Sequence, residues 1–192
     1  MRIFLAGATG VLGIRLVPLL VEAGHEVAGT TRSPEKGERV RELGGEPVVL
    51  DVFEKERLVE AVTAFGPDIV MHQLTALPDD PARIAEAAAA NARIRSEGTR
   101  NLLDAARAAG APRFLAQSIA WNPPSEHETL VLEAGGVVLR YGRLYGPGTY
   151  YERERPDPPR IHVDDAARRT VEALDAPSGI VTLTEGDVTK TT

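Results

Sequence analysis

The sequence predicts an α/β protein in which helices cover both faces of a doubly wound parallel sheet of six or seven strands. Two observations carry this prediction. Short apolar runs of strand length alternate with helical segments along most of the 192 residues, which is typical of strand–helix–strand units. The first apolar run, residues 2–6, leads into a glycine-rich turn at residues 7–13 and then into a helical segment that Gly24 ends. Continuous apolar runs of this kind fit strands that are buried on both faces.

The other elements follow from the same patterns in order. Further strands are expected at residues 26–30, 47–50, 69–76, 113–117, 137–141 and 179–184, the run at 69–76 including the loop after its strand. Helices are expected at residues 11–23, 35–43, 54–65, 82–109, 125–134 and 161–174, with a soft break at Gly98 in the fourth. The acidic residues and proline at 79–81 mark the start of that fourth helix. Asp164 or Asp165 can cap the last helix.

Composition excludes several classes of function. The formal net charge of −6 gives no reason to expect nucleic acid or an anionic membrane surface as a partner. Without cysteine there is no disulfide, thiolate nucleophile or sulfur ligand, and the four histidines show no metal-binding spacing. No apolar run reaches the roughly 20 residues that span a bilayer, and the N-terminal segment resembles a strand rather than a signal peptide. We therefore expect one domain, residues 1–192, in the cytoplasm and without a metal site.

The glycine-rich turn predicts a dinucleotide site. Gly7 lets the chain turn sharply, Gly10 lets the backbone approach a pyrophosphate, and Gly13 lets the helix pack close to the sheet. The helix N-terminus then offers unpaired N–H groups and a partial positive charge to the phosphates. The spacing GxxGxxG departs from the generic GxGxxG, so a glycine turn without a ligand is the alternative. The residues expected to line the cofactor here are Gly7, Ala8, Thr9, Gly10, Val11, Leu12 and Gly13.

The end of the second strand bears on which dinucleotide binds. Folds that select NAD place an acidic residue there to hold the ribose 2′-hydroxyl. This chain has Thr30, Thr31 and Arg32 instead, and an arginine suits a 2′-phosphate. The sequence therefore favours NADP, with NAD as the alternative, although Arg32 can also be read as a solvated loop residue.

Several of these stretches resemble the extended short-chain dehydrogenase/reductase superfamily, and within it the NAD-dependent epimerase/dehydratase group. The resemblance rests on GATGVLG at residues 7–13, on GTRNLL at 98–103 with Asn91 before it, on Ser118, on LRYGRLYGPG at 139–148 and on IHVDD at 161–165. It implies a Rossmann-like fold and an NAD(P) cofactor. In that family the substrate region follows the YGPG turn, so residues 142–192 resemble the remnant of a substrate-binding region that is much reduced here.

The resemblance also implies positions for further cofactor contacts. The acidic residue after the third strand lies by the adenine in that family, which assigns Asp51 and its neighbour Val52 to the site. Asp51 could equally cap the helix at residues 54–65. Leu74, Thr75 and Ala76 follow the fourth strand, and ligands of open α/β sheets lie beyond such strand ends. His72 just before them is read as a packing residue.

The family's catalytic residues are only partly present. Ser118 ends the fifth strand where the family keeps a serine or threonine that hydrogen-bonds the reacting oxygen of the substrate. The tyrosine and lysine that follow it four residues apart in that family are absent, because no lysine lies between Lys55 and Lys190. Candidate replacements for the acid are Tyr145, whose pKa should stay near ~10, and His127. Ser118 and Tyr145 are thus the candidate catalytic residues.

The sequence therefore predicts an NAD(P)-binding, epimerase/dehydratase-like protein, an oxidoreductase with impaired or altered catalysis that acts on an unknown small molecule. The alternative is a noncatalytic NADP-binding sensor or partner-binding protein. The alanine-rich helix at residues 82–109 could pack on the sheet or on a second subunit, which makes a homodimer a further expectation.

Overall fold

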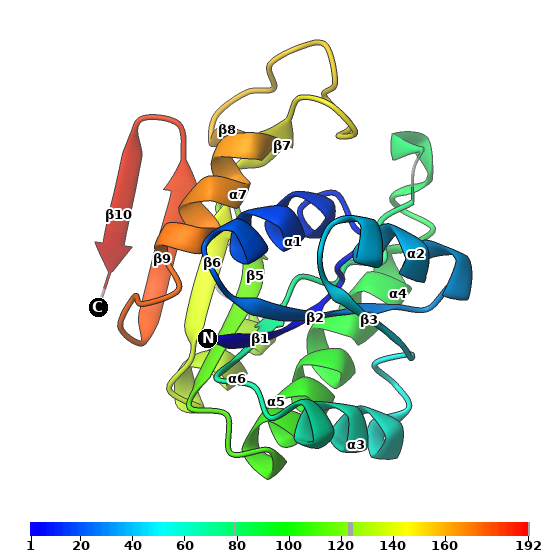
Figure 1. The fold of residues 1–192 in the computed structure, drawn as a ribbon. Coiled ribbons are helices and arrows are strands. Elements are labelled where there is room, and N and C mark those ends of the chain that lie inside the picture. Colours follow the sequence, from blue (N-terminus) through cyan, green and yellow to red (C-terminus); the bar gives the residue numbers. More distant parts are fainter. Residues whose placement is uncertain (79, 123–124, 192) are drawn as a thin grey trace.

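A computed structural model describes residues 1–78, 80–122 and 125–191. Its main feature is one eight-stranded sheet in the order β10-β9-β6-β5-β4-β1-β2-β3 (Figure 1). The parallel strands are β1 (Arg2–Ala6), β2 (Glu26–Thr31), β3 (Glu46–Val49), β4 (Ile69–His72), β5 (Arg113–Ile119), β6 (Val137–Tyr141) and β9 (Gly179–Thr184). The doubly wound sheet of six or seven parallel strands is confirmed. The antiparallel edge strand β10 (Asp187–Thr191) was not predicted.

The strand order reverses beside β1. Ile3 pairs with Val27 of β2 on one side and with Ile69 of β4 on the other, so chain order runs outward in both directions from the pair β1 and β4. Connections that leave such neighbouring strands toward opposite faces open a crevice at their carboxyl ends, where ligands of these folds bind. The glycine turn follows β1 directly and therefore lies at this crevice.

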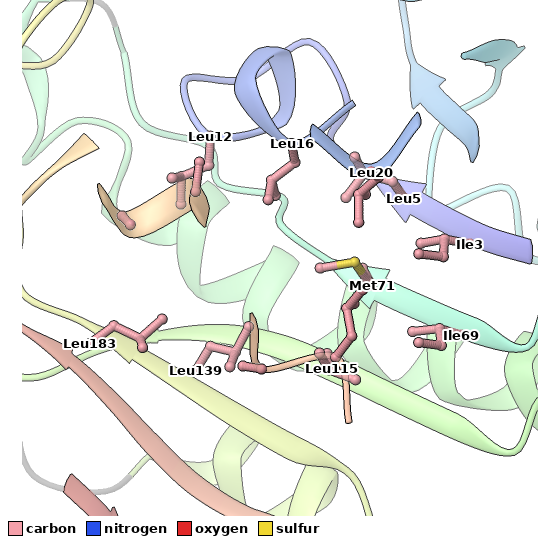
Figure 2. Close-up of a cluster of buried hydrophobic side chains, with 14 of the residues drawn as sticks. Ile3, Leu5, Leu12, Leu16, Leu20, Ile69, Met71, Leu115, Leu139 and Leu183 are labelled. Atoms are coloured by element: carbon pink, nitrogen blue, oxygen red, sulfur yellow. The ribbon is translucent and has the colours of Figure 1, made fainter. Parts of the chain in front are cut away.

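Alternation along the central strands builds two hydrophobic layers. On one face Ile3 and Leu5 pack with the helices α1 (Gly13–Glu22), α2 (Pro34–Glu42) and α7 (Val163–Glu172). Figure 2 shows part of this cluster, in which Met71 lies between Leu16 and Leu20 of α1 on one side and Leu115 and Leu139 of the sheet on the other. On the other face Phe4 and Ala6 pack with α3 (Lys55–Phe65), α5 (Thr99–Ala108) and α6 (Glu126–Glu133). Both faces of the sheet are covered, as its uninterrupted apolar strands require.

The expectation of one helix over residues 82–109 is wrong. The segment consists of a 3₁₀ turn η1 (Pro81–Arg83), α4 (Ala88–Arg93), a π-helical stretch η2 (Ile94–Gly98) and α5. The Ile94 backbone lies close enough to the buried ring of His72 to oppose the lowering of its pKa by burial, so the irregular turn adjoins the end of β4. Asp80 accepts from the backbone N–H of Ala82 at 2.9 Å and caps only the 3₁₀ turn. Asp79 lies outside the described residues, as do Pro123 and Pro124 before α6.

Two expected helix caps are also corrected. The first residue before α7 is His162, whose ring nitrogen accepts from the Asp164 N–H at 3.3 Å, so neither Asp164 nor Asp165 caps this helix. At α3 the side chain of Asp51 accepts from the Phe53 N–H at 3.0 Å within the preceding turn, and no side chain caps the helix itself. Asp164 and Asp165 lie inside the first turn of α7 and so cannot occupy the capping position, whereas Asp51 lies too far before α3 and bonds the preceding turn instead.

The segments on the two sides of the YGPG turn form a small sheet of their own. Two short strands, β7 (Arg143–Tyr145) and β8 (Arg160–His162), pair in parallel as a second, small sheet. In Figure 1 this pair lies beside the N-terminal end of α7. Within the described ranges, no helix combines the length and the apolar character that a membrane crossing requires.

Candidate functional site

Packing explains two of the three glycines in the turn but not the third. A Cβ on Gly13 would lie 2.1 Å from the Gly7 oxygen, and one on Gly7, whose φ is 97°, would lie 3.0 Å from the Gln73 carbonyl. These contacts hold the helix against the turn and the turn against the end of β4. Gly10 is exposed, and its Cβ would meet only the Gly7 oxygen, at 3.4 Å. Nothing in the fold therefore requires glycine at position 10, whereas close approach of a ligand would.

The N-terminus of α1 is open toward this turn. No side chain caps the helix, and its first turn carries no acidic residue. The N–H groups of Ile14 and Arg15 already donate to the carbonyls of Gly10 and Leu12, so the helix offers an anion its partial positive charge and the backbone just before Ile14. Ala8 and Leu12 point into the core, while Thr9 is half-buried and Val11 is 37% exposed. Of the predicted turn residues, only Thr9 and Val11 can present side chains to a ligand; Ala8 and Leu12 can contribute backbone alone.

The end of β2 is tied to the glycine turn by its two threonines. The hydroxyl of Thr30 accepts from the Gly7 N–H at 3.1 Å, and that of Thr31 accepts from the Thr9 hydroxyl at 3.4 Å. Arg32 follows directly and is exposed, and within the described ranges no hydrogen bond or ion pair involves its side chain. Its guanidinium is thus available beside the turn, as recognition of a 2′-phosphate requires.

The remaining predicted contacts lie in loops at the same edge of the sheet. Val52 is buried and its carbonyl accepts from the Asn101 amide at 3.0 Å, while Asp51 is half-buried. Beyond β4, the Leu74 carbonyl accepts from the Gln117 amide at 3.2 Å, and the Ala76 N–H donates to Asn91 at 3.1 Å. Thr75 between them is exposed. Side chains of α4 and β5 therefore hold the loop in place.

Ser118 is buried and its hydroxyl is already bonded. It is 2% exposed and donates to Oε1 of Glu128 at 2.5 Å, while Arg140 donates to both oxygens of that carboxylate, at 2.9 and 2.7 Å. Burial by itself raises the pKa of Glu128, but the hydrogen bonds from Arg140 and Ser118 outweigh it and hold the pKa below its usual value. The ionised Glu128 therefore anchors Ser118 and the end of β6, a contact that no sequence pattern indicated.

Both histidines beside this network are neutral structural groups. Burial lowers the pKa of His72 to about 3, and its Nδ1 accepts from the Leu74 N–H at 3.2 Å. The packing interpretation of His72 is confirmed. His127 is 3% exposed, and its two ring nitrogens hydrogen-bond the Ser125 hydroxyl at 2.7 Å and the Gln117 carbonyl at 3.2 Å. Burial lowers the pKa of His127 as well, so the expectation that it could replace the missing acid is wrong.

Tyr145 lies in β7, and its partner is Glu185 and not Glu128. Its hydroxyl donates to Glu185, its ring meets that of His162 edge-on at 5.1 Å, and the Arg155 guanidinium lies 5.5 Å from the ring centre. The hydrogen bond to Glu185 raises the pKa of Tyr145, so the expected ordinary value is wrong. In the described part of the chain no hydrogen bond joins Tyr145 to Ser118. The two candidate catalytic side chains thus belong to separate networks.

Arg15 of α1 connects the glycine turn to the segment after the YGPG turn. Its guanidinium donates to Asp164 at 2.7 Å, to the Val11 carbonyl at 2.8 Å and to the Pro147 carbonyl at 2.6 Å. Farther along this segment the Tyr150 hydroxyl donates to the Pro78 carbonyl, in the loop that follows β4. The sequence offered no sign of the long-range links, because they join positions more than 60 residues apart. No cluster of metal-ligating side chains occurs among the residues that the structure describes.

Comparisons with known proteins agree with this architecture. The model of the NAD dependent epimerase/dehydratase family matches residues 3–133. A Streptomyces protein named 3-diazoavenalumate denitrifying reductase is 37% identical over 228 residues, covering 92% of this chain and 73% of the reductase. That alignment is longer than the chain itself, so the reductase contains residues with no counterpart here.

Two solved structures have a similar fold. A UDP-glucose 4-epimerase from Thermus thermophilus, solved in complex with NAD, superposes with a TM-score of 0.77 at 21% identity and covers 99% of this chain and 79% of its own. ChuY, an anaerobillin reductase from Escherichia coli, superposes with a TM-score of 0.72 at 18% identity, covering 98% of this chain and 99% of its own. The second neighbour therefore matches this chain over nearly the whole of both.

Proposed function

Because this chain belongs to the NAD-dependent epimerase/dehydratase family, it is an NAD(P)-binding, oxidoreductase-like protein, and we propose that it is an NADPH-dependent reductase of a small molecule. The exposed Gly10 carries the cofactor part of this proposal, since neither packing nor a positive φ accounts for glycine there. The exposed and unpaired Arg32 supports the 2′-phosphate form over NAD.

The cofactor would lie along the carboxyl edge of the sheet. The turn from Gly7 to Gly13 would hold the pyrophosphate through backbone N–H groups and the end of α1. Arg32 would meet the 2′-phosphate, Asp51 and Val52 would border the adenine, and the loop Leu74, Thr75 and Ala76 would border the nicotinamide half. When bound, the cofactor would supply a hydride to the substrate, and solvent would supply the proton that completes the reduction. The chain's own part is to bind both partners and keep them aligned.

Reduction is favoured over epimerisation by the kind of relatives and by the site. Curated relatives named as reductases include the Streptomyces protein and a ketoreductase of Stigmatella aurantiaca, which is 35% identical over 60% of this chain. Epimerisation requires a base that takes and returns a proton at the reacting hydroxyl. Here the Ser118 hydroxyl is bonded to Glu128, and the pKa of Tyr145 is raised. A direct role of Ser118 or Tyr145 would need these hydrogen bonds to open, so we assign them no step. A cytoplasmic setting and a homodimer stay predictions.

Calorimetric titration with NADPH, NADP, NADH and NAD tests the cofactor assignment. We expect the wild type to bind NADPH most tightly and Gly10→Val to lose most of this affinity, because a branched side chain blocks the pyrophosphate. Gly37→Ala is the matched control, since its added methyl group meets Pro47 and Val49 at ordinary distances and lies in α2. If the wild type binds none of the four, the proposal fails. Equal binding by Gly10→Val would place the cofactor elsewhere.

A further inference from the structure

Arg95 is a half-buried cation without a partner. It lies in the π-helical stretch η2, and its Nε is buried with no hydrogen bond. Within the described ranges no carboxylate is close enough to pair with it. The other half-buried arginines of those ranges all bond to a carboxylate or a carbonyl, namely Arg2, Arg15, Arg113, Arg140, Arg143, Arg160 and Arg169. Arg95 is the one half-buried arginine of those ranges whose guanidinium has no hydrogen-bond or ion-pair partner.

The nearest acid has no capacity left for it. Glu128 is within electrostatic reach of Arg95, but each of its oxygens already accepts two hydrogen bonds. Oε1 accepts from Ser118 and from Arg140, and Oε2 accepts from Arg140 and, at 3.4 Å, from the Ser125 N–H. A carboxylate offers about four acceptor sites. Glu128 therefore contributes a distant field to Arg95 but no bond.

The two neighbouring histidines are saturated in the same way. Both are within electrostatic reach of Arg95. The His72 Nδ1 accepts from the Leu74 N–H and its ring also interacts with the Ile94 backbone, while the two ring nitrogens of His127 bond Ser125 and Gln117. Neither histidine therefore offers the guanidinium a free acceptor. Burial lowers the pKa of Arg95, so the fold keeps this cation partly out of water without an internal anion to stabilise it.

The position of Arg95 points to the substrate end of the crevice. Its π-helical stretch lies beside the buried ring of His72 at the end of β4 and contacts α6, which follows Ser118. The pyrophosphate would lie at the turn after β1, so the ends of β4 and β5 would border the reacting half of the cofactor. In this chain the segment between Ser118 and α6 carries no lysine. Arg95 therefore adds a positive charge on the stretch that packs against α6, close to the end of β4.

We propose that Arg95 binds a carboxylate of the substrate, so that the reductase acts on small organic acids. This inference rests on the proposed function. The planar guanidinium fork matches the two oxygens of a carboxylate, and a single partly buried cation is neutralised by one negative charge. A ligand carboxylate would thereby pair with the only half-buried arginine that has no partner among the described residues.

Benzoate and its neutral isostere benzamide are suitable probes, with inorganic phosphate as a third. Each is titrated into the protein with and without saturating NADP, and binding is followed by calorimetry and by fluorescence of Trp121. Trp121 is the sole tryptophan, is 40% exposed and lies three residues after Ser118. We expect benzoate to bind at least tenfold more tightly than benzamide. Arg95→Met should abolish this difference, and Arg95→Lys should retain part of it. Arg107→Met, at an exposed position of α5, is the control and should keep it.

Thermal unfolding separates this role from a purely structural one. The melting temperature of Arg95→Met should be higher than that of the wild type, because the substitution removes an unpaired, half-buried cation. If Arg95 instead had a structural role, its replacement would lower the melting temperature. A lower melting temperature, an unchanged preference for benzoate in Arg95→Met, or no preference in the wild type would each overturn the inference. If phosphate binds more tightly than benzoate, the assignment of a carboxylate as the group bound by Arg95 is wrong. NADPH affinity should be unchanged in Arg95→Met, so loss of cofactor binding by the wild type would instead refute the proposed function.

Discussion

At the scale of single residues, we expect loss of the Glu128 carboxylate to destabilise the protein strongly. Glu128→Gln leaves the partly buried Arg140 without its anion and Ser118 with a weaker acceptor. Breaking a buried pair of this kind costs about 3–5 kcal/mol of the free energy of unfolding, measured by chemical denaturation. Glu126→Gln on the same helix is the control. Its pair with Arg100 is exposed, so its loss should cost about 0–1 kcal/mol.

The same residue predicts how stability depends on pH. The pKa of Glu128 is lower in the folded than in the unfolded protein, because Arg140 and Ser118 bond its ionised form. Its stabilisation is therefore complete above the unfolded pKa of ~4.3 and is lost as the pH falls through the folded pKa. Denaturation curves between pH 7 and pH 3 should show a smaller acid loss in Glu128→Gln than in the wild type. Parallel losses in the two proteins would contradict this assignment.

Arg32 sets the expected preference between the two dinucleotides. A charge-assisted hydrogen bond contributes about 1.5–3 kcal/mol, which is roughly a tenfold to hundredfold change in affinity. Arg32→Ala should therefore lower the affinity for NADPH by that factor and leave the affinity for NADH unchanged, as measured by calorimetry. Arg41→Ala, which is exposed on α2 and paired only with Glu38, is the control. An unchanged ratio of the two affinities in Arg32→Ala would refute the role of Arg32.

At the level of elements, the packing of α1 on the glycine turn admits a sharp test. Gly13→Ala places a Cβ 2.1 Å from the Gly7 oxygen, a backbone atom that cannot move aside without shifting the helix. We expect it to destabilise by about 3 kcal/mol or more, at the upper end of overpacked sites. Gly37→Ala, inside α2, should instead stabilise by about 0.5–1 kcal/mol, because alanine is the better helix former and meets only ordinary contacts. Equal effects of the two changes would show that α1 is free to shift.

Elements whose pattern is local were predictable from the sequence. All seven parallel strands and the helices beside them follow from apolar runs and glycine stops, and the roles of Gly7 and Gly13 agree with their contacts. The region from Ala82 to Gly98 was not predictable, because alanine favours a helix everywhere while the observed π-helical stretch packs beside His72, 22 residues earlier in the chain than Ile94. The short strands β7 and β8 also escaped prediction, since a three-residue strand has too few positions to show alternation.

The candidate site could be predicted only where a local sequence motif indicates it. The glycine turn and Arg32 can be read from neighbouring residues, and Ser118 lies at the end of β5 as expected. That its hydroxyl is held by Glu128 could not be inferred, because the carboxylate is ten residues away and its partner Arg140 lies on another strand. The role proposed for Arg95 could not be predicted for the same reason. What distinguishes Arg95 is that its buried Nε has no hydrogen-bond partner, and this can be recognised only in the folded structure.

At the scale of the whole molecule, we predict no UDP-glucose 4-epimerase activity despite the similar fold. A positioned general acid or base contributes about 10²–10⁴-fold in rate, and neither Ser118 nor Tyr145 is free to act as one. Incubation with UDP-glucose and NAD, followed by chromatography of the sugar nucleotides, should yield none of the 4-epimer above the level of a protein-free sample. Turnover that Ser118→Ala abolishes would contradict this prediction and would show that the bond to Glu128 opens during the reaction.

The central place of β1 has a consequence for how the chain folds. Ile3 finds one neighbour at Val27 and the other only at Ile69, so the middle of the sheet closes across a long stretch of intervening chain. Pairings of this kind require a large loss of chain entropy before they are stabilised, which slows folding. Until β4 pairs with β1, one edge of β1 has no hydrogen-bonding partner. The apolar side chains of Phe4 and Leu5 are then only partly shielded from water. Newly made chains should therefore pass through a stage that is prone to aggregation and that ends only when β4 joins β1.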